Sequence, residues 1–251
     1  MNFEKTSNPA FSESRLRGLA ESFAGTGQMT MAGTATKTLV LFALLVLTAS
    51  ITWKMFGVES TALMPCMIVG GIGSLVFAII SCVKPEKAYI FGPLYALCEG
   101  LLVGAVSAMY AAALDGIVLS AVLLTLAVSA VVFLCYRFGL LKASGTFVKV
   151  ITYATIGIGV FYLLTFILGL FGVNISLTSG MGTMGIVIQL VIVGVAALNL
   201  VLDFNNVENG VYNGVPAQFE WYYAFGLMVT LIWIYFEILK LLWMIAARSR
   251  D

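Results

Sequence analysis

The stretch that decides the fold reads MGTMGIVIQLVIVGVAALNLVLD over residues 181–203. Apart from its final aspartate it carries no charged side chain, and as a helix it is long enough to cross the roughly 30 Å hydrocarbon core of a bilayer. A second such run, residues 223–246, contains Glu237. Ionised carboxylates are costly at membrane depth, and they persist there where they face protein or do the protein's work. Asp203 and Glu237 are therefore the first candidates for a functional site.

Composition places the whole chain in a membrane. Of its 251 residues, 61% are hydrophobic and 10% are charged, whereas a soluble domain of this size needs far more surface charge. The formal net charge is +1 and no basic run alternates with aromatic residues, so nucleic acid is not expected as a partner. The absence of histidine removes the usual zinc ligand and the usual general base. We expect a protein that is not an enzyme and has no cofactor, in which any pH response comes from carboxylates.

Seven apolar stretches have the length of a membrane-spanning helix. Because the connections between most of them are short, consecutive helices are expected to run antiparallel, with no separate soluble domain. The sequence predicts an all-α membrane protein with a polar cytoplasmic N-terminal tail, residues 1–37, and a seven-helix transmembrane domain, residues 38–247. The seven stretches are approximately residues 38–56, 62–82, 90–113, 117–136, 149–171, 181–203 and 223–246.

The distribution of lysine and arginine predicts the orientation. Basic residues gather in the tail, the second loop and the fourth loop, whereas the loops on the other side hold only Lys54 before the C-terminus. The positive-inside rule then puts the N-terminus in the cytoplasm and, with seven spans, the C-terminus outside. Arg248 and Arg250 favour an alternative in which the last segment re-enters and both termini are cytoplasmic. The basic residues of the predicted cytoplasmic side are Lys5, Arg15, Arg17, Lys37, Lys84, Lys87, Arg137, Lys142 and Lys149.

The sixth loop differs from its basic neighbours because it carries Asp203, Glu208 and Glu220 and no lysine or arginine. An acidic vestibule below the last two helices would attract cations. For Glu208 and Glu220, a merely solvated loop is the favoured alternative.

The third span contains a stripe of small residues at helical spacing, beginning with Gly100 and Gly104 and continuing through Ser107. Small residues let helix backbones approach closely, so this stripe predicts a packing contact with another helix. Glu99 lies beside it, well inside the span. A buried carboxyl without a cation is expected to be protonated and to donate a hydrogen bond across helices, so structural and functional roles are both open for Glu99.

The residues alone leave two interpretations of Asp203 and Glu237. Asp203 closes the predicted sixth span, and Glu237 lies more than ten residues into the seventh, so the two meet only if the sixth helix ends deep or the seventh begins outside the core. In the first interpretation they share a functional site. In the second, Asp203 is an ordinary helix end in water and Glu237 pairs with Lys240 at i,i+3 on its own helix.

Three short motifs give the chain a resemblance to a known family. LDFNNV at residues 202–207 and IYFEIL at residues 234–239 resemble the two signature segments of the Bax inhibitor-1 family of membrane proteins, and EGLLVG at residues 99–104 resembles that family's third helix. The resemblance extends over about residues 38–247. The tail, with SNPAF at residues 7–11, looks like that of a bacterial branch.

The resemblance implies a seven-helix fold in which the last helix is central and surrounded by the other six. It also implies a pH-sensitive calcium leak, controlled by two aspartates of the sixth and seventh helices that share a proton. Asp203 matches the first of these aspartates, whereas Glu237 stands where the second is expected and is one methylene longer. The family's closed state can use a basic residue at the cytoplasmic end of the second helix, for which Lys84 is the candidate here.

The sequence thus favours a calcium or other cation leak in a bacterial plasma membrane, gated by Asp203 and Glu237, which would also bind the permeating Ca²⁺. Two close carboxylates cannot easily both ionise, so one would keep a proton, and losing it would offer oxygen ligands to calcium. One alternative is a regulator without transport that binds another membrane protein, such as a quality-control protease. An intramembrane aspartyl protease fits less well, because LVL at residues 200–202 replaces the Gly-x-Gly that precedes the catalytic aspartate in such proteases.

Overall fold

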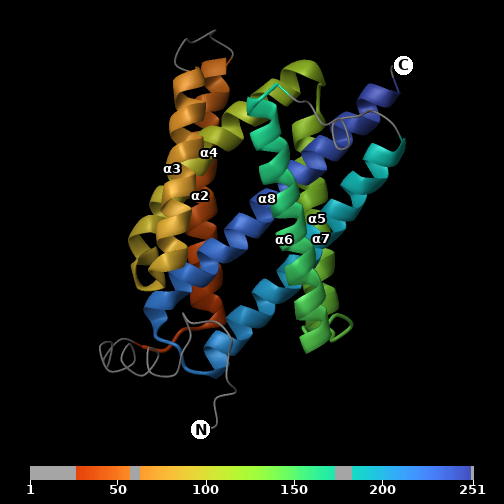
Figure 1. Ribbon diagram of the computed structural model, residues 1–251. Coiled ribbons are helices and arrows are strands. Elements are labelled where there is room, and N and C mark those ends of the chain that lie inside the picture. Colours follow the sequence, from red (N-terminus) through yellow and green to blue (C-terminus); the bar gives the residue numbers. More distant parts are fainter. Residues whose placement is uncertain (1–26, 57–62, 173–182, 250–251) are drawn as a thin grey trace. The chain divides into compact units, whose positions relative to one another are not determined.

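The computed structural model describes residues 27–56, 63–172 and 183–249, and these ranges are almost entirely helical (Figure 1). Three of the basic residues used for the predicted orientation, Lys5, Arg15 and Arg17, lie outside the described residues, as do most of the predicted tail and Arg250.

Seven helices follow one another in the order that the apolar stretches predict, and each is long and apolar enough to cross a membrane. Within the described ranges they are accompanied by two short 3₁₀ turns, η2 (Pro85–Lys87) and η3 (Ala217–Phe219), and by no β-strand. The prediction of an all-α, seven-helix membrane protein is therefore confirmed. The helices are α2 (Met31–Phe56), α3 (Leu63–Val83), α4 (Ala88–Ala113), α5 (Ile117–Arg137), α6 (Gly145–Leu170), α7 (Thr183–Tyr212) and α8 (Glu220–Arg248).

The end of α7 differs from the prediction. The apolar run stops at Asp203, but the helix continues through a polar segment to Tyr212 and ends where Gly214 adopts a left-handed φ of 64°. Hydropathy marks where a helix leaves hydrocarbon, whereas backbone hydrogen bonds and a C-terminal glycine decide where it stops. Asp203 is therefore not a helix end in water, and it lies more than two turns inside α7.

The described chain divides into two compact units that share three helices. Unit 1 contains α2, α3, the part of α4 up to Ala105 and the segment 206–226, which joins α7 to α8. Unit 2 contains residues 106–205, that is the end of α4, α5, α6 and most of α7, together with α8 from Leu227 onward.

In unit 1, α2 and α4 pack backbone against backbone. A Cβ on Gly104 would overlap the carbonyl oxygen of Ala49, and a Cβ on Gly100 would overlap the carbonyl oxygen of Leu45. The contact is possible because both positions in α4 lack a side chain. The predicted packing role of the small-residue stripe is confirmed for these two glycines, with α2 as the partner helix.

Unit 1 also contains a clamp, formed by residues 27–37 on residues 215–220. Gln28 and Pro216 form an isolated β-bridge, and the Met29 amide donates to the carbonyl of Val215 at 2.8 Å. Glu220 accepts from the Thr30 amide at 2.7 Å and forms a salt bridge with Lys37. With 4% of its surface exposed, Glu220 is not the solvated loop residue that the sequence favours. Because α2 begins at Met31, Lys37 is a helical residue and its side chain can reach this carboxylate.

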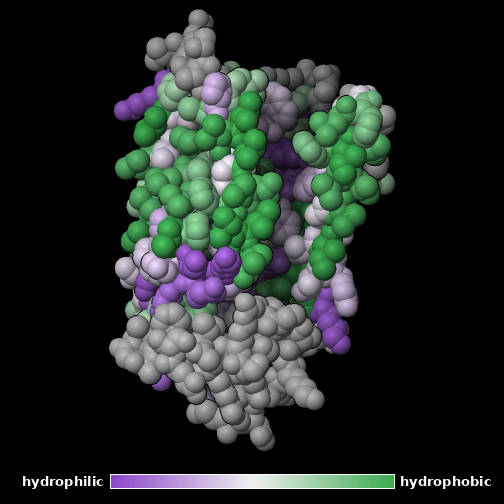
Figure 2. Space-filling view, turned by 60° about the vertical axis from the view of Figure 1, so that its left-hand side comes forward, coloured by the Kyte–Doolittle hydropathy of each residue, from purple (hydrophilic) through white to green (hydrophobic). Residues whose placement is uncertain are grey.

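The surfaces of the helices show which of them face lipid. In α6 only Ile151 is buried, whereas α8 exposes only Val229, Ile245 and Arg248. Most side chains of the last helix are therefore buried or half-buried. Figure 2 shows hydrophobic side chains over most of the described surface in that view, with hydrophilic ones gathered in a band toward its lower end. A bilayer is the environment that such a surface requires.

Candidate functional site

Glu237 lies at the centre of a cage of three hydrogen-bond donors in unit 2. Tyr162 of α6 donates its hydroxyl to the carboxylate, with oxygen–oxygen distances of 3.0 Å to Oε1 and 2.9 Å to Oε2. Gln189 of α7 donates to Oε2 at 2.6 Å, and Trp233, one turn earlier in α8, donates its indole N–H to Oε1 at 2.9 Å. We call Tyr162, Gln189 and Trp233 the donor cage. It joins three helices at one carboxylate that is 5% exposed.

The groups next to the donor cage also indicate that a hydrogen-bond acceptor lies at its centre. Nε2 of Gln189 also donates to the backbone carbonyl of Glu237 at 3.0 Å, which fixes the orientation of the amide, because the reversed amide would place oxygen against oxygen. Lys240 lies over the Tyr162 ring, 5.3 Å from its centroid. The side-chain hydrogen bonds of Glu237 are those of the donor cage, so the predicted i,i+3 partner contacts the cage rather than the carboxylate.

Asp203, in the same unit, has far fewer hydrogen-bond partners than Glu237. Thr230 of α8 lies close to the Asp203 carboxyl, and Oδ2 of Asp203 is buried with no hydrogen-bond partner among the described residues. A buried polar atom without a partner costs about 1–3 kcal/mol, so such atoms call for an explanation. A cation or a water at Oδ2 would supply the missing partner, and a proton there would remove the charge that is costly to bury.

The two acids lie along one polar seam between α7 and α8, but they do not meet. We call Gln189, Asp203, Thr230, Trp233 and Glu237 the α7–α8 seam. The positions of its α8 members, 230, 233 and 237, put them on one face of that helix. The hydrogen bonds of Asp203 and of Glu237 do not join the two side chains, and Thr230 and Glu237 are seven residues apart, about 10 Å of helix rise. The shared-proton contact implied by the resemblance is not formed in this structure.

Glu99 is a third buried acid, and it belongs to unit 1. It is 7% exposed and lies close to Ser74 of α3, whose hydroxyl donates to the carbonyl of Gly71 in its own helix at 3.2 Å. The geometry gives Glu99 a packing role between α3 and α4 and brings it to no second acid among the described hydrogen bonds.

Lys84, the predicted gate partner, lies just after the end of α3 at the start of η2. Its side chain is exposed, and together with Lys87 it lines a shallow hollow of about 320 Å³ whose other walls are apolar. Both lysines belong to unit 1. The described contacts do not connect Lys84 with a carboxylate.

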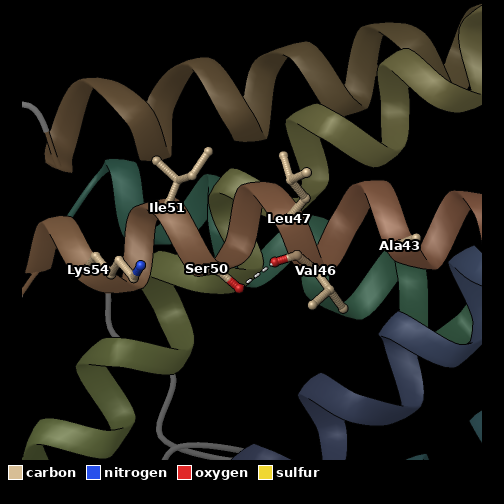
Figure 3. Close-up of a pocket in the computed structure, with 6 residues that line it drawn as sticks. All are labelled: Ala43, Val46, Leu47, Ser50, Ile51 and Lys54. Carbon is tan, nitrogen blue, oxygen red and sulfur yellow. Dashed lines mark hydrogen bonds between the residues drawn. The ribbon is translucent and has the colours of Figure 1, made fainter.

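A larger hollow, of about 540 Å³, lies on one face of α2 and is shown in Figure 3. Its Ser50 hydroxyl donates to the carbonyl of Val46 in the same helix at 2.7 Å, so this polar atom is already satisfied. The walls are otherwise aliphatic apart from Lys54 at one end. This hollow has no chemistry for a cation, and the α7–α8 seam is the better candidate site.

Each of these acids would offer calcium a single carboxylate. No group of three or more Asp, Glu, Cys or His side chains that could hold a metal together occurs in the described ranges. Calcium prefers six to eight oxygen ligands, of which Asp203 or Glu237 would each supply those of one carboxylate. A single carboxylate that holds a cation briefly as it passes is compatible with this arrangement.

Sequence reasoning found the two acids but missed the donor cage and Thr230. Trp233 and Glu237 are four residues apart, which is a recognisable helical pair, and Gln189 interrupts an otherwise apolar run. Tyr162 carries no such signal, because a tyrosine in a lipid-facing helix looks like any other aromatic residue. Its role becomes visible when α6 is placed beside α8.

Comparison with known proteins gives one family. The family model described as Bax inhibitor 1 like matches residues 8–247, which is nearly the whole chain. Comparisons with curated proteins and with solved structures give no match.

Proposed function

The chain belongs to the Bax inhibitor 1 like family, and on that premise we propose that it is a pH-sensitive leak for calcium or other cations. The observation that supports this proposal most is the buried Oδ2 atom of Asp203, which has no hydrogen-bond partner among the described residues. A polar atom of this kind is costly to keep between two apolar membrane helices. Binding of a mobile ion or a proton at the site would account for it.

Protons and calcium compete for Asp203 in this mechanism. The protonated carboxyl is neutral and closes the seam to cations, because a charge has no solvation there. Loss of the proton creates a fixed negative charge and a hard oxygen ligand, which is what Ca²⁺ prefers. The leak therefore opens as the pH rises and closes as the pH falls.

The setting that we propose is a bacterial plasma membrane, with the N-terminus in the cytoplasm. The basic residues of the second and fourth loops support this orientation, and all five lie in the described ranges: Lys84, Lys87, Arg137, Lys142 and Lys149. The lipid bilayer is the partner that all seven helices require.

The geometry favours a leak over intramembrane proteolysis. In an aspartyl protease the two catalytic carboxylates lie about 3 Å apart and share one proton. Here the two acids belong to different parts of the seam, and the hydrogen-bonding capacity of Glu237 is taken up by the donor cage. An attacking water held between Asp203 and Glu237 has no place in this arrangement.

Calcium flux into liposomes that contain the purified protein, measured between about pH 5 and pH 8, tests the proposal. We expect flux that rises with pH in the wild type and a pH response that is lost in Asp203→Asn, because an amide cannot exchange a proton in this range. Asp115→Asn is the matched control, since Asp115 is exposed in the turn between α4 and α5.

Flux equal to that of empty liposomes at every pH would overturn the leak and favour a regulator that binds another membrane protein. Cleavage of a membrane peptide by the wild type, absent in both Asp203→Asn and Glu237→Gln, would instead show a protease. A pH response that survives in Asp203→Asn would remove Asp203 from the mechanism.

A further inference from the structure

We propose that Glu237 is a positioning residue that the donor cage holds between α6, α7 and α8, and that Asp203 alone offers an oxygen to the passing cation. The inference rests on the proposed leak and divides the roles of its two acids. It follows from the different surroundings of two carboxyl groups on the same seam.

Both oxygens of the Glu237 carboxylate are engaged by hydrogen-bond donors. Three donors reach the two oxygens of this carboxylate: the single hydroxyl proton of Tyr162 is shared by both oxygens, and Gln189 and Trp233 each donate one N–H. A calcium ion bound at 2.3–2.6 Å would have to displace these donors and leave them buried without acceptors. Asp203 differs from Glu237, because its Oδ2 atom accepts no hydrogen bond from the described residues.

The donor cage is surrounded by a small set of charged and titratable groups. The charged and titratable groups facing Glu237 in unit 2 are Lys240 of α8, Tyr162 of α6 and Tyr110 of α4, which lies within electrostatic reach. Asp203 is not among its hydrogen-bond partners. A charge on Glu237 would therefore be compensated locally, by neutral donors and a lysine one turn away, without an ion from solution.

Helix α8 links the donor cage to Asp203. Trp233 lies one turn after Thr230 on the same face of α8, and Thr230 is the residue that contacts Asp203. By fixing α8 against α6 and α7, the donor cage sets where Thr230 stands relative to Asp203. Glu237 thus acts on the cation site through the position of α8.

Removing a single donor tests the cage through stability. Tyr162→Phe deletes one hydroxyl and keeps the ring, and Tyr153→Phe is the matched control, because Tyr153 lies on the same helix and is 71% exposed. We expect Tyr162→Phe to lower the melting temperature in detergent by several degrees and Tyr153→Phe to leave it unchanged. Equal melting temperatures for the two variants would overturn the cage.

Flux measured well below the melting temperature separates positioning from mere support of the fold. We expect Tyr162→Phe to change the maximal flux by about fivefold at an unchanged midpoint pH. Glu237→Gln should likewise keep the midpoint pH of the wild type. A pH response that is lost in Glu237→Gln, as it is in Asp203→Asn, would overturn the division of roles.

The double variant gives an independent readout. If Asp203 and Glu237 act at separate places, the fold-changes in flux of Asp203→Asn and Glu237→Gln should multiply to within about a factor of two. A double variant that conducts as well as Glu237→Gln would show that Asp203 acts only together with Glu237, and would overturn the inference. If the wild type itself does not conduct, the leak proposal fails, and the melting temperatures of the two tyrosine variants still decide whether the cage exists.

Discussion

Glu220→Gln is expected to lower the melting temperature of the detergent-solubilised protein by roughly 5–10 °C. The carboxylate of Glu220 accepts from the amide and the hydroxyl of Thr30 and pairs with Lys37. A glutamine keeps the size but presents an amide N–H₂ toward these donors and leaves the half-buried lysine without its counter-charge. Breaking such a pair while leaving one partner in place typically costs several kcal/mol.

Two controls define the result. Asp115→Asn removes an exposed acid and is expected to leave the melting temperature unchanged. Added salt should not reproduce the loss in the wild type, because a buried pair is poorly screened. A Glu220→Gln protein that melts with the wild type would show that the clamp between residues 27–37 and 215–220 contributes nothing to the folded state.

Gly104→Ala is the second large effect that we expect, with a loss of about 1–3 kcal/mol of stability. A methyl group at this position would overlap the backbone of Ala49 and the hydroxyl of Thr52, and backbone cannot move aside as a flexible side chain can. Helices α2 and α4 would have to separate along their closest approach. The melting temperature in detergent measures the loss.

Gly157→Ala is the matched control, because it also lies within a membrane helix but a Cβ there would meet nothing within 4 Å. Alanine is the better helix former, so this variant is expected to melt at or slightly above the wild-type temperature. If both alanine variants behaved alike, the close contact of α2 with α4 would not be a source of stability.

The spans were predictable because the bilayer leaves a strong pattern. Each of the seven apolar runs corresponds to a helix, since a chain in hydrocarbon must satisfy its backbone polar groups within itself. The ends were less predictable, because a helix can continue into water. Residues 204–212 are polar yet helical, which moved Asp203 from a predicted helix end to the interior of α7.

The candidate site was likewise predictable from the sequence only in part. Acids stand out in an apolar sequence, so Asp203, Glu237 and Glu99 could be singled out directly. Their partners could not, because Tyr162 comes to Glu237 from another helix, 75 residues away in the chain. The distance between Asp203 and Glu237 depends on how α7 and α8 pair along their length, which hydropathy does not encode.

The clamp on the N-terminal segment has a consequence for biogenesis. The hydrogen bond from Thr30 to Glu220 joins positions 190 residues apart, and a ribosome needs about 10–40 s to synthesise that length of chain. The segment that leads the first helix therefore waits for nearly the whole polypeptide before its partner exists. Closure of the clamp is therefore a late event, and a nascent chain arrested before residue 215 should leave residues 27–30 open to added protease.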